Sequence, residues 1–126
     1  MLNNPLVSVV VTLYNYEKYI KDCLLSIKKQ DYDNIEIIVV DDCSKDESVN
    51  VANSVDDVKV IALTENKGYS FCKNVGIKSS KGEVIVLLDA DDTVGFLLLL
   101  AILILLAITI FHTRPNLTIK KKELKK

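Results

Sequence analysis

The sequence predicts an α/β protein with an open, mostly parallel four-stranded sheet and flanking helices, followed by one hydrophobic helix. Three observations support this fold class: four short β-branched segments, helical periodicity between them, and a long uncharged segment later in the chain. Strands and helices that alternate along a chain are typical of a parallel sheet, whose right-handed crossovers place helices on both faces.

Each predicted strand is a short run rich in Val, Ile and Leu, with almost no polar alternation. This pattern is expected for strands that are covered on both faces, as in a parallel sheet. The four segments are Leu6 to Tyr14, Ile35 to Asp41, Val58 to Thr64 and Glu83 to Asp89.

Three helices are predicted between these strands. In the first, apolar residues recur at helical spacing after Asn15, the expected N-cap, as far as Ile27. The second starts with "SKDE" at residues 44–47, which has the form of a capping box, and extends to about Asn53. The third covers about residues 70–79. The resulting order, β-α-β-α-β-α-β, is Rossmann-like.

Charge is distributed unevenly along the 126 residues. Up to Asp92, 10 Lys are outweighed by 16 Asp and Glu, a net charge of −6, whereas six Lys and Arg and one Glu from Thr93 onward give +5. The three cysteines are far apart and form no C-x-x-C pair, which argues against a disulfide framework or a zinc site and favours packed, reduced thiols. No nucleic-acid partner is expected. No cleavable signal precedes the first apolar segment, so we expect the acidic head to fold in the cytoplasm.

The uncharged segment Val94 to Phe111 has 18 residues, enough for roughly 27 Å of helix, which is close to a bilayer core. We expect a single-pass transmembrane helix over residues 94–112 and a basic tail over residues 113–126. A buried core helix is the alternative, and an apolar surface all round argues against it. The positive-inside rule favours an external head, whereas a head that folds before the span emerges stays cytoplasmic; we favour the cytoplasmic head.

Polar residues follow each predicted strand, at the edge of the sheet where open α/β folds bind their ligands. After the fourth strand they are Asp89, Asp91 and Asp92. Of these, Asp89 and Asp91 are hard oxygen donors without a neighbouring His or Cys, which suit Mg²⁺ or Mn²⁺ better than zinc or copper. A solvated turn is the alternative, but the position directly after a buried strand favours a metal site. The glycine patterns of dinucleotide sites and P-loops do not occur in the sequence.

Two stretches resemble a known family. "VSVVVTLYNYEKYIKDCLLSIKKQDYDNIEIIVVDDCSKDES" and "NKGYSFCKNVGIKSSKGEVIVLLDADD" are similar to the amino-terminal, nucleotide-binding half of family 2 glycosyltransferases, which have the glycosyltransferase-A fold. The resemblance covers roughly Pro5 to Val94. It implies a nucleotide-sugar-binding domain over residues 1–93 that is incomplete after its D-x-D motif. The family's usual strand order also implies that the fourth strand lies at a sheet edge.

The resemblance assigns the nucleotide to the ends of the first two strands. The segment from Thr12 through Tyr14 to Asn15 would lie against the donor nucleotide, with Tyr14 stacking near the base. Asp42 would hydrogen-bond the base, usually uracil, because a carboxylate can accept from a ring N–H group. A UDP-sugar is therefore the expected donor.

The resemblance assigns the diphosphate and the metal to the third helix and the fourth strand. Lys73 would face the diphosphate as a point charge, without the bidentate fork of an arginine. Within the D-x-D motif, Asp89 would lie near the ribose and Asp91 would bind Mn²⁺ or Mg²⁺. The cation would neutralise charge on the leaving nucleoside diphosphate.

The resemblance does not supply a catalytic base. Inverting members of the family need a carboxylate from the second half of the domain to deprotonate the acceptor, and after Val94 only Glu123 follows, in the basic tail. We therefore expect a membrane-attached hexosyltransferase that needs a partner chain to supply the acceptor half. A non-catalytic nucleotide-sugar binder and a truncated gene product are the alternatives.

Overall fold

The computed structural model describes residues 4–95, 101, 104–106 and 108. Strands and helices alternate in the predicted order through residue 89, and the strand boundaries agree with the sequence analysis to within two residues. The elements are β1 (Val7–Leu13), α1 (Ile20–Lys28), β2 (Ile35–Asp41), α2 (Ser48–Asn53), β3 (Val58–Ala62), α3 (Tyr69–Ser79) and β4 (Val84–Asp89).

The four strands form one parallel sheet in the order β3-β2-β1-β4. In this register Val9 lies beside Ile37 of β2 on one side and Val86 of β4 on the other. All seven residues of β1 are buried, which explains its run of valines without polar alternation. The parallel sheet and the edge position of β4 confirm two predictions.

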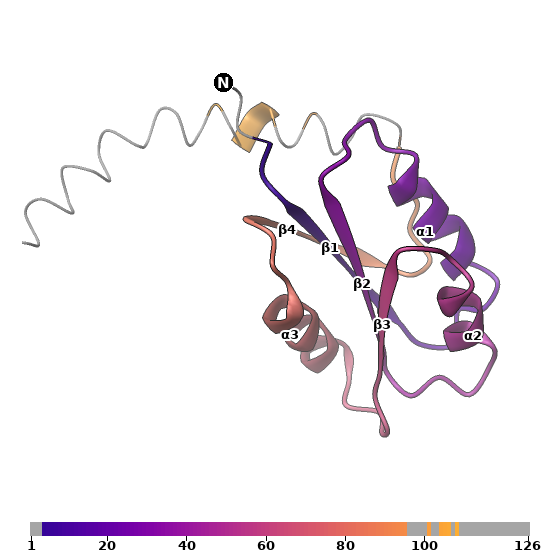
Figure 1. The fold of residues 1–126 in the computed structure, drawn as a ribbon. Helices are drawn as coiled ribbons and strands as arrows, with labels where there is room; N and C mark the ends of the chain where they lie inside the picture. The colour runs from indigo at the N-terminus through magenta and orange to yellow at the C-terminus, as the bar shows by residue number, and fades with distance from the viewer. Residues whose placement is uncertain (1–3, 96–100, 102–103, 107, 109–126) are drawn as a thin grey trace, which may run out of the picture.

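Helices cover both faces of the sheet, as predicted (Figure 1). On one face, α1 and α2 pack over Val9, Val11 and their neighbours in the main hydrophobic core. On the other face, α3 packs against β1 and β2, with Cys72 beside Ile38. This helix lies very close to the sheet because Gly76 faces Val10, and a Cβ at position 76 would lie 2.2 Å from Cγ1 of Val10.

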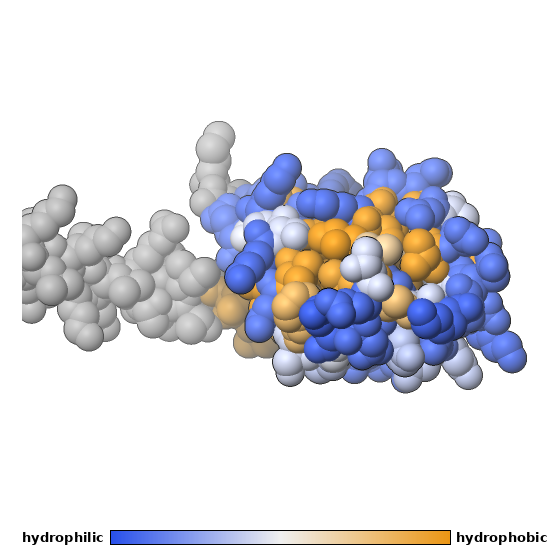
Figure 2. All heavy atoms as spheres, turned by 90° about the horizontal axis from the view of Figure 1, so that it is seen from below, coloured by the Kyte–Doolittle hydropathy of each residue, from blue (hydrophilic) through white to orange (hydrophobic). Residues whose placement is uncertain are grey.

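Among the described residues, nothing fully covers the sheet along β4. Ile85 is 39% exposed and Leu87 is 42% exposed, and their register with Ser8 and Val10 places both on the face that α3 covers further along the sheet. On the face seen from below, hydrophobic residues reach the surface between hydrophilic ones (Figure 2). An edge strand with exposed apolar side chains offers unpaired backbone groups to other chains.

The predicted starts of the first two helices were wrong. α1 begins at Ile20, because Asn15 adopts a positive φ of 55° and uses its side chain to accept from the backbone N–H of Lys45, 2.8 Å away. α2 begins at Ser48, because Ser44 donates its hydroxyl to Asp41 and does not cap the helix. Both polar side chains bond to residues outside their own helix.

The predicted transmembrane helix, residues 94–112, lies largely outside the described residues, and the basic tail, residues 113–126, lies wholly outside them. Within the described part of the chain, none of the helices combines the length and the hydrophobicity that crossing a bilayer requires.

Candidate functional site

A cleft of about 300 Å³ lies at the carboxyl ends of the strands, where the sequence analysis places a ligand. Residues from the ends of β1, β2 and β4 and from the start of α3 surround it. Five of the seven predicted site residues, Thr12, Tyr14, Asp42, Asp89 and Asp91, line this cleft. The other lining residues are Leu13, Tyr16, Tyr69 and Cys72.

The ends of β1 and β4 are joined by a side-chain bond within the cleft. The hydroxyl of Thr12 donates to Oδ1 of Asp89 over 2.9 Å, and the backbone N–H of Ala90 donates to the carbonyl of Thr12 over 3.1 Å. The thiol of Cys23, on α1, also donates to the carbonyl oxygen of Asp89 over 3.7 Å. Asp89 is therefore fixed from both faces of the sheet.

Three carboxylates gather directly after β4. One oxygen from each of Asp89, Asp91 and Asp92 lies within 4.8 Å of the others, with Asp89 half-buried and the other two exposed. Three hard oxygen donors without His or Cys fit Mg²⁺ or Mn²⁺, which keep waters and share substrate phosphates. From the residues alone, Asp89 and Asp91 were the expected metal donors, and the resemblance placed Asp91 on the cation. The adjacent "DADD" letters were the signal that Asp92 could join them.

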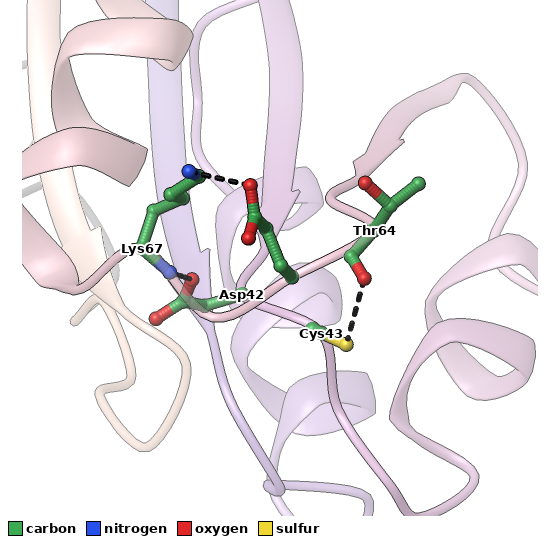
Figure 3. A network of polar contacts seen from close by, with 5 residues as sticks. Asp42, Cys43, Thr64 and Lys67 are labelled. Atoms are coloured by element: carbon green, nitrogen blue, oxygen red, sulfur yellow. Dashed lines mark hydrogen bonds and ion pairs between the residues drawn. The ribbon is translucent and has the colours of Figure 1, made fainter.

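Asp42 is almost fully buried, 6% exposed, and binds the loop before α3. One of its carboxylate oxygens accepts from the backbone N–H of Lys67 at 2.7 Å (Figure 3). The other accepts from the backbone N–H of Gly68 at 3.0 Å. The side chain of Lys67 turns away to an ion pair with Glu65 at 2.5 Å. Gly68 has a φ of 89°, a conformation that favours glycine, and α3 starts at the next residue. Asp42 thus sets where α3 begins.

Asn15 lies outside the cleft lining. Its backbone N–H donates to the hydroxyl of Ser44 over 2.9 Å, and its side chain accepts from Lys45. These bonds hold the segment after β1 against the segment after β2, so Asn15 fixes the loop that carries Tyr14. A direct contact between Asn15 and a nucleotide stays a prediction.

Lys73 also lies outside the lining, but beside it. Its Nζ is 4.5 Å from the ring centroid of Tyr69, one turn earlier on α3. Tyr69 lines the cleft and is 48% exposed. Burial raises the pKa of the Tyr69 hydroxyl, and the nearby carboxylate of Asp89 raises it further. Tyr69 was not among the predicted site residues. Its position directly after a loop glycine, at the start of a helix that faces the strand ends, was a usable signal.

Two thiols lie near the site. Burial raises the pKa of Cys23 to about 12, and the carboxylates of Asp92, Asp91 and Asp89 add to the shift. Burial raises the pKa of Cys72 to about 11, with a further contribution from Asp42. Because the thiolate is the reactive form, both cysteines act as packing groups, as expected.

A second cleft, of about 400 Å³, lies between α1 and the segment after β4. It contains none of the predicted site residues. Gln30 donates there to the carbonyls of Ser26 and Gly95, at 3.0 and 3.1 Å, and Ser26 accepts from the backbone N–H of Val94 at 2.9 Å. These bonds fix the path of the chain as it leaves the sheet.

Comparison with known proteins supports the resemblance that was found in the sequence, and it covers the residues that form the sheet and the cleft. The profile of the family described as glycosyl transferase family 2 matches residues 8–103. A Haemophilus influenzae protein described as an uncharacterized glycosyltransferase is 36% identical over 98 residues, which are 75% of this chain and 39% of that protein. The chain therefore spans well under half of this relative.

Two solved structures share the fold. S. aureus TarS in complex with UDP-GlcNAc superposes with a TM-score of 0.75 and 33% identity, over 86% of this chain and 32% of that one. The mannosyltransferase PcManGT from Pyrobaculum calidifontis, in complex with GDP-Man and Mn²⁺, superposes with a TM-score of 0.66 and 31% identity, over 71% of this chain and 28% of that one.

Proposed function

This chain belongs to glycosyl transferase family 2, and we propose that its cleft binds a UDP-sugar through Mn²⁺ or Mg²⁺ for glycosyl transfer. The observation that carries the proposal is the meeting of Thr12, Tyr14, Asp42, Asp89 and Asp91 in one cleft at the carboxyl ends of the strands. These residues lie at or just after the ends of β1, β2 and β4, which are far apart in the sequence. Their meeting supports one shared ligand.

The chemistry of the cleft suits a nucleotide and its diphosphate. Tyr14 is 44% exposed and offers an aromatic face on which a base can stack. The carboxylate of Asp42, which lines the cleft, suits a base with a ring N–H group, and UDP-GlcNAc in TarS is a precedent for a uracil nucleotide in this fold. We therefore favour UDP over GDP, although PcManGT holds GDP-Man.

The acid cluster would hold the divalent cation. Asp91 and Asp92 are exposed toward solvent, whereas Thr12 orients Asp89. Mn²⁺ in complex with PcManGT supports a cation for this fold. When bound, the cation supplies positive charge that stabilises the departing nucleoside diphosphate. Asp89 would contribute its remaining oxygen to the cation or to a ribose hydroxyl.

Transfer itself requires groups beyond this cleft. An inverting hexosyltransferase needs a carboxylate that deprotonates the acceptor hydroxyl, and the carboxylates that line the described cleft are all assigned to the donor or its metal. We infer that a partner chain supplies the acceptor half. A second candidate is a non-catalytic nucleotide-sugar binder. It is favoured by the same observation, that no carboxylate lining the described cleft is left to act as the base.

We also propose that residues 94–112 attach the protein to a membrane in a single pass, with the head in the cytoplasm, where nucleotide sugars are made. The support is the run of 18 uncharged residues from Val94 to Phe111. In sealed inverted vesicles, a protease should digest the head; protection of the head would contradict this orientation.

Calorimetry tests the donor site directly. The full chain, purified in detergent, is titrated with UDP in the presence of Mn²⁺ and again with EDTA, next to the variant Asp91→Ala. The matched control is Asp33→Ala, which removes an exposed carboxylate from the loop between α1 and β2. We expect Mn²⁺-dependent binding that Asp91→Ala abolishes and Asp33→Ala preserves.

The outcomes separate the candidates. Absence of Mn²⁺-dependent heat with the unchanged chain would reject both the transferase and the binder. Binding without hydrolysis or transfer of a UDP-sugar, with or without candidate partner chains, would favour the non-catalytic binder.

A further inference from the structure

Tyr69 and Lys73 form a cation–π pair on α3. They are four residues apart, a spacing that places side chains on the same face of a helix. The distance of 4.5 Å from Nζ to the ring centroid is well inside the range over which an ammonium group is attracted to an aromatic face. Lys73 is half-buried, so part of its stem is packed as well.

The ring of Tyr69 links this lysine to the cleft. Tyr69 lines the cleft together with Asp89 and Asp91. Burial raises the pKa of its hydroxyl, and the hydrogen bond and charge of the nearby Asp89 carboxylate raise it further. One side chain thus contacts Lys73 through its ring and faces the acid cluster with its hydroxyl.

A lysine needs such support more than an arginine does. Its ammonium group is a point charge on a stem with four rotatable carbons, and holding it in one place costs side-chain entropy. A contact made before the ligand binds lowers that cost at the time of binding. The other side of the stacked ammonium group keeps its N–H donors for an anion.

We propose that Tyr69 is a positioning residue, whose ring holds the ammonium group of Lys73 at the edge of the cleft, ready for the diphosphate of a nucleotide. This inference rests on the proposed function and adds to it a residue that acts through Lys73. It predicts that loss of the aromatic ring at position 69 weakens diphosphate binding when Lys73 is present and has no effect when Lys73 is replaced.

The test compares UDP affinities, by calorimetry with Mn²⁺, for the full chain and its variants. Tyr69→Leu removes the ring and Tyr69→Phe retains it. Phe71→Leu is the matched control, because Phe71 is an aromatic residue of the same helix that is 45% exposed and lies outside the cleft lining. Each substitution is repeated in a Lys73→Met background, and uridine, which has no diphosphate, is titrated by NMR.

We expect Tyr69→Leu to weaken UDP binding by about two- to fivefold, the range that an exposed cation–π contact supports. Tyr69→Phe and Phe71→Leu should stay close to the unchanged chain. In the Lys73→Met background, Tyr69→Leu should have no further effect, and uridine affinity should not change.

Two results would overturn the inference while the proposed function stands. One is UDP affinity in Tyr69→Leu equal to that of the unchanged chain. The other is an equal loss from Tyr69→Leu with and without Lys73, which would mean that Tyr69 contacts the ligand itself. If the unchanged chain does not bind UDP, the proposed function fails, and this inference fails with it.

Discussion

The hydroxyl of Thr12 donates a hydrogen bond of 2.9 Å to Oδ1 of Asp89 and so joins the ends of β1 and β4 inside the cleft. The two residues are also register partners in the sheet, and Thr12 is only 8% exposed. The bond leaves one carboxylate oxygen of Asp89 for other partners. It fixes the orientation of the first acid of the D-x-D motif.

Replacing Thr12 by Val should therefore impair both stability and metal binding. The isosteric change leaves the carboxylate of Asp89 without its donor, at a cost of about 1 kcal/mol in the free energy of unfolding. Urea unfolding and Mn²⁺ titration measure the two effects. Thr12→Ser keeps the hydroxyl and serves as the control. Equal stability and equal Mn²⁺ affinity in the Val and Ser variants would show that the bond does not orient Asp89.

Asp92 is expected to contribute to cation binding together with Asp91. Asp92→Asn keeps the size of the side chain but removes one of the three gathered charges, so Mn²⁺ affinity should fall. The affinity is measured by electron paramagnetic resonance of free Mn²⁺ during titration of the full chain. Asp33→Asn, remote from the cleft, should match the unchanged chain. Unaltered affinity in Asp92→Asn would remove Asp92 from the proposed ligands.

Gly76→Ala should destabilise the domain by about 1–3 kcal/mol, because the new methyl group would overlap Val10 between α3 and the sheet. Gly95→Ala is the control, since no atom of the described part of the chain lies within 4 Å of a Cβ at that position. Thermal or urea unfolding gives the two free energies. In a Val10→Ala background the cost of Gly76→Ala should shrink; an undiminished cost would point to a cause other than this overlap.

Glu36 should make the stability of the domain depend on pH. Burial alone would raise the pKa of this carboxyl, but hydrogen bonds from the hydroxyl of Ser8 and the backbone N–H groups of Lys81 and Gly82 outweigh it and lower the pKa below the ordinary 4.5. A lowered pKa in the folded state gives stability that is present above pH 4.5 and is lost as the pH falls through the folded value.

Glu36→Gln tests this dependence. The variant cannot titrate at position 36, so its free energy of unfolding in urea should fall less steeply below pH 4.5 than that of the unchanged chain. Parallel curves for the two proteins between pH 3 and 6 would mean that Glu36 has the same pKa in both states.

Alkylation should distinguish the three cysteines. At pH 8 the thiols of Cys23 and Cys72 remain protonated, with pKa values of about 12 and 11, and both are buried. Cys43 is only partly buried. Mass spectrometry after a short treatment with iodoacetamide should find the label on Cys43, and in urea on all three. Native labelling of Cys23 as fast as that of Cys43 would contradict the packed environment around α1.

The order of elements and the position of the site could be predicted from the sequence because both follow from local patterns. The buried runs of Val and Ile predicted the parallel strands, and in a parallel sheet the carboxyl ends meet at one edge. Tyr14, Asp42, Asp89 and Asp91 were predictable for that reason, whereas Thr12 was predicted only through the family resemblance.

The features that could not be predicted depend on contacts between residues that are distant in the sequence. Asn15 was predicted to cap α1, but its partner is the backbone of Lys45, 30 residues later. Asp42 was expected to face a base, and its bonds to Lys67 and Gly68 were invisible until the loop before α3 was placed. Tyr69 could have been suspected from its place at a helix start, but its position near Asp89 depends on how α3 packs on the sheet.

The bonds of Asp42 also make the loop before α3 a natural reporter. A carboxylate has about four positions for hydrogen-bond donors, and the backbone amides of Lys67 and Gly68 already take two. A base that bonds to Asp42 has to share these oxygens, so the two amides should change their ¹⁵N shifts and their hydrogen-exchange rates. Occupancy of the base site could thus be followed at two backbone positions without any label on the ligand.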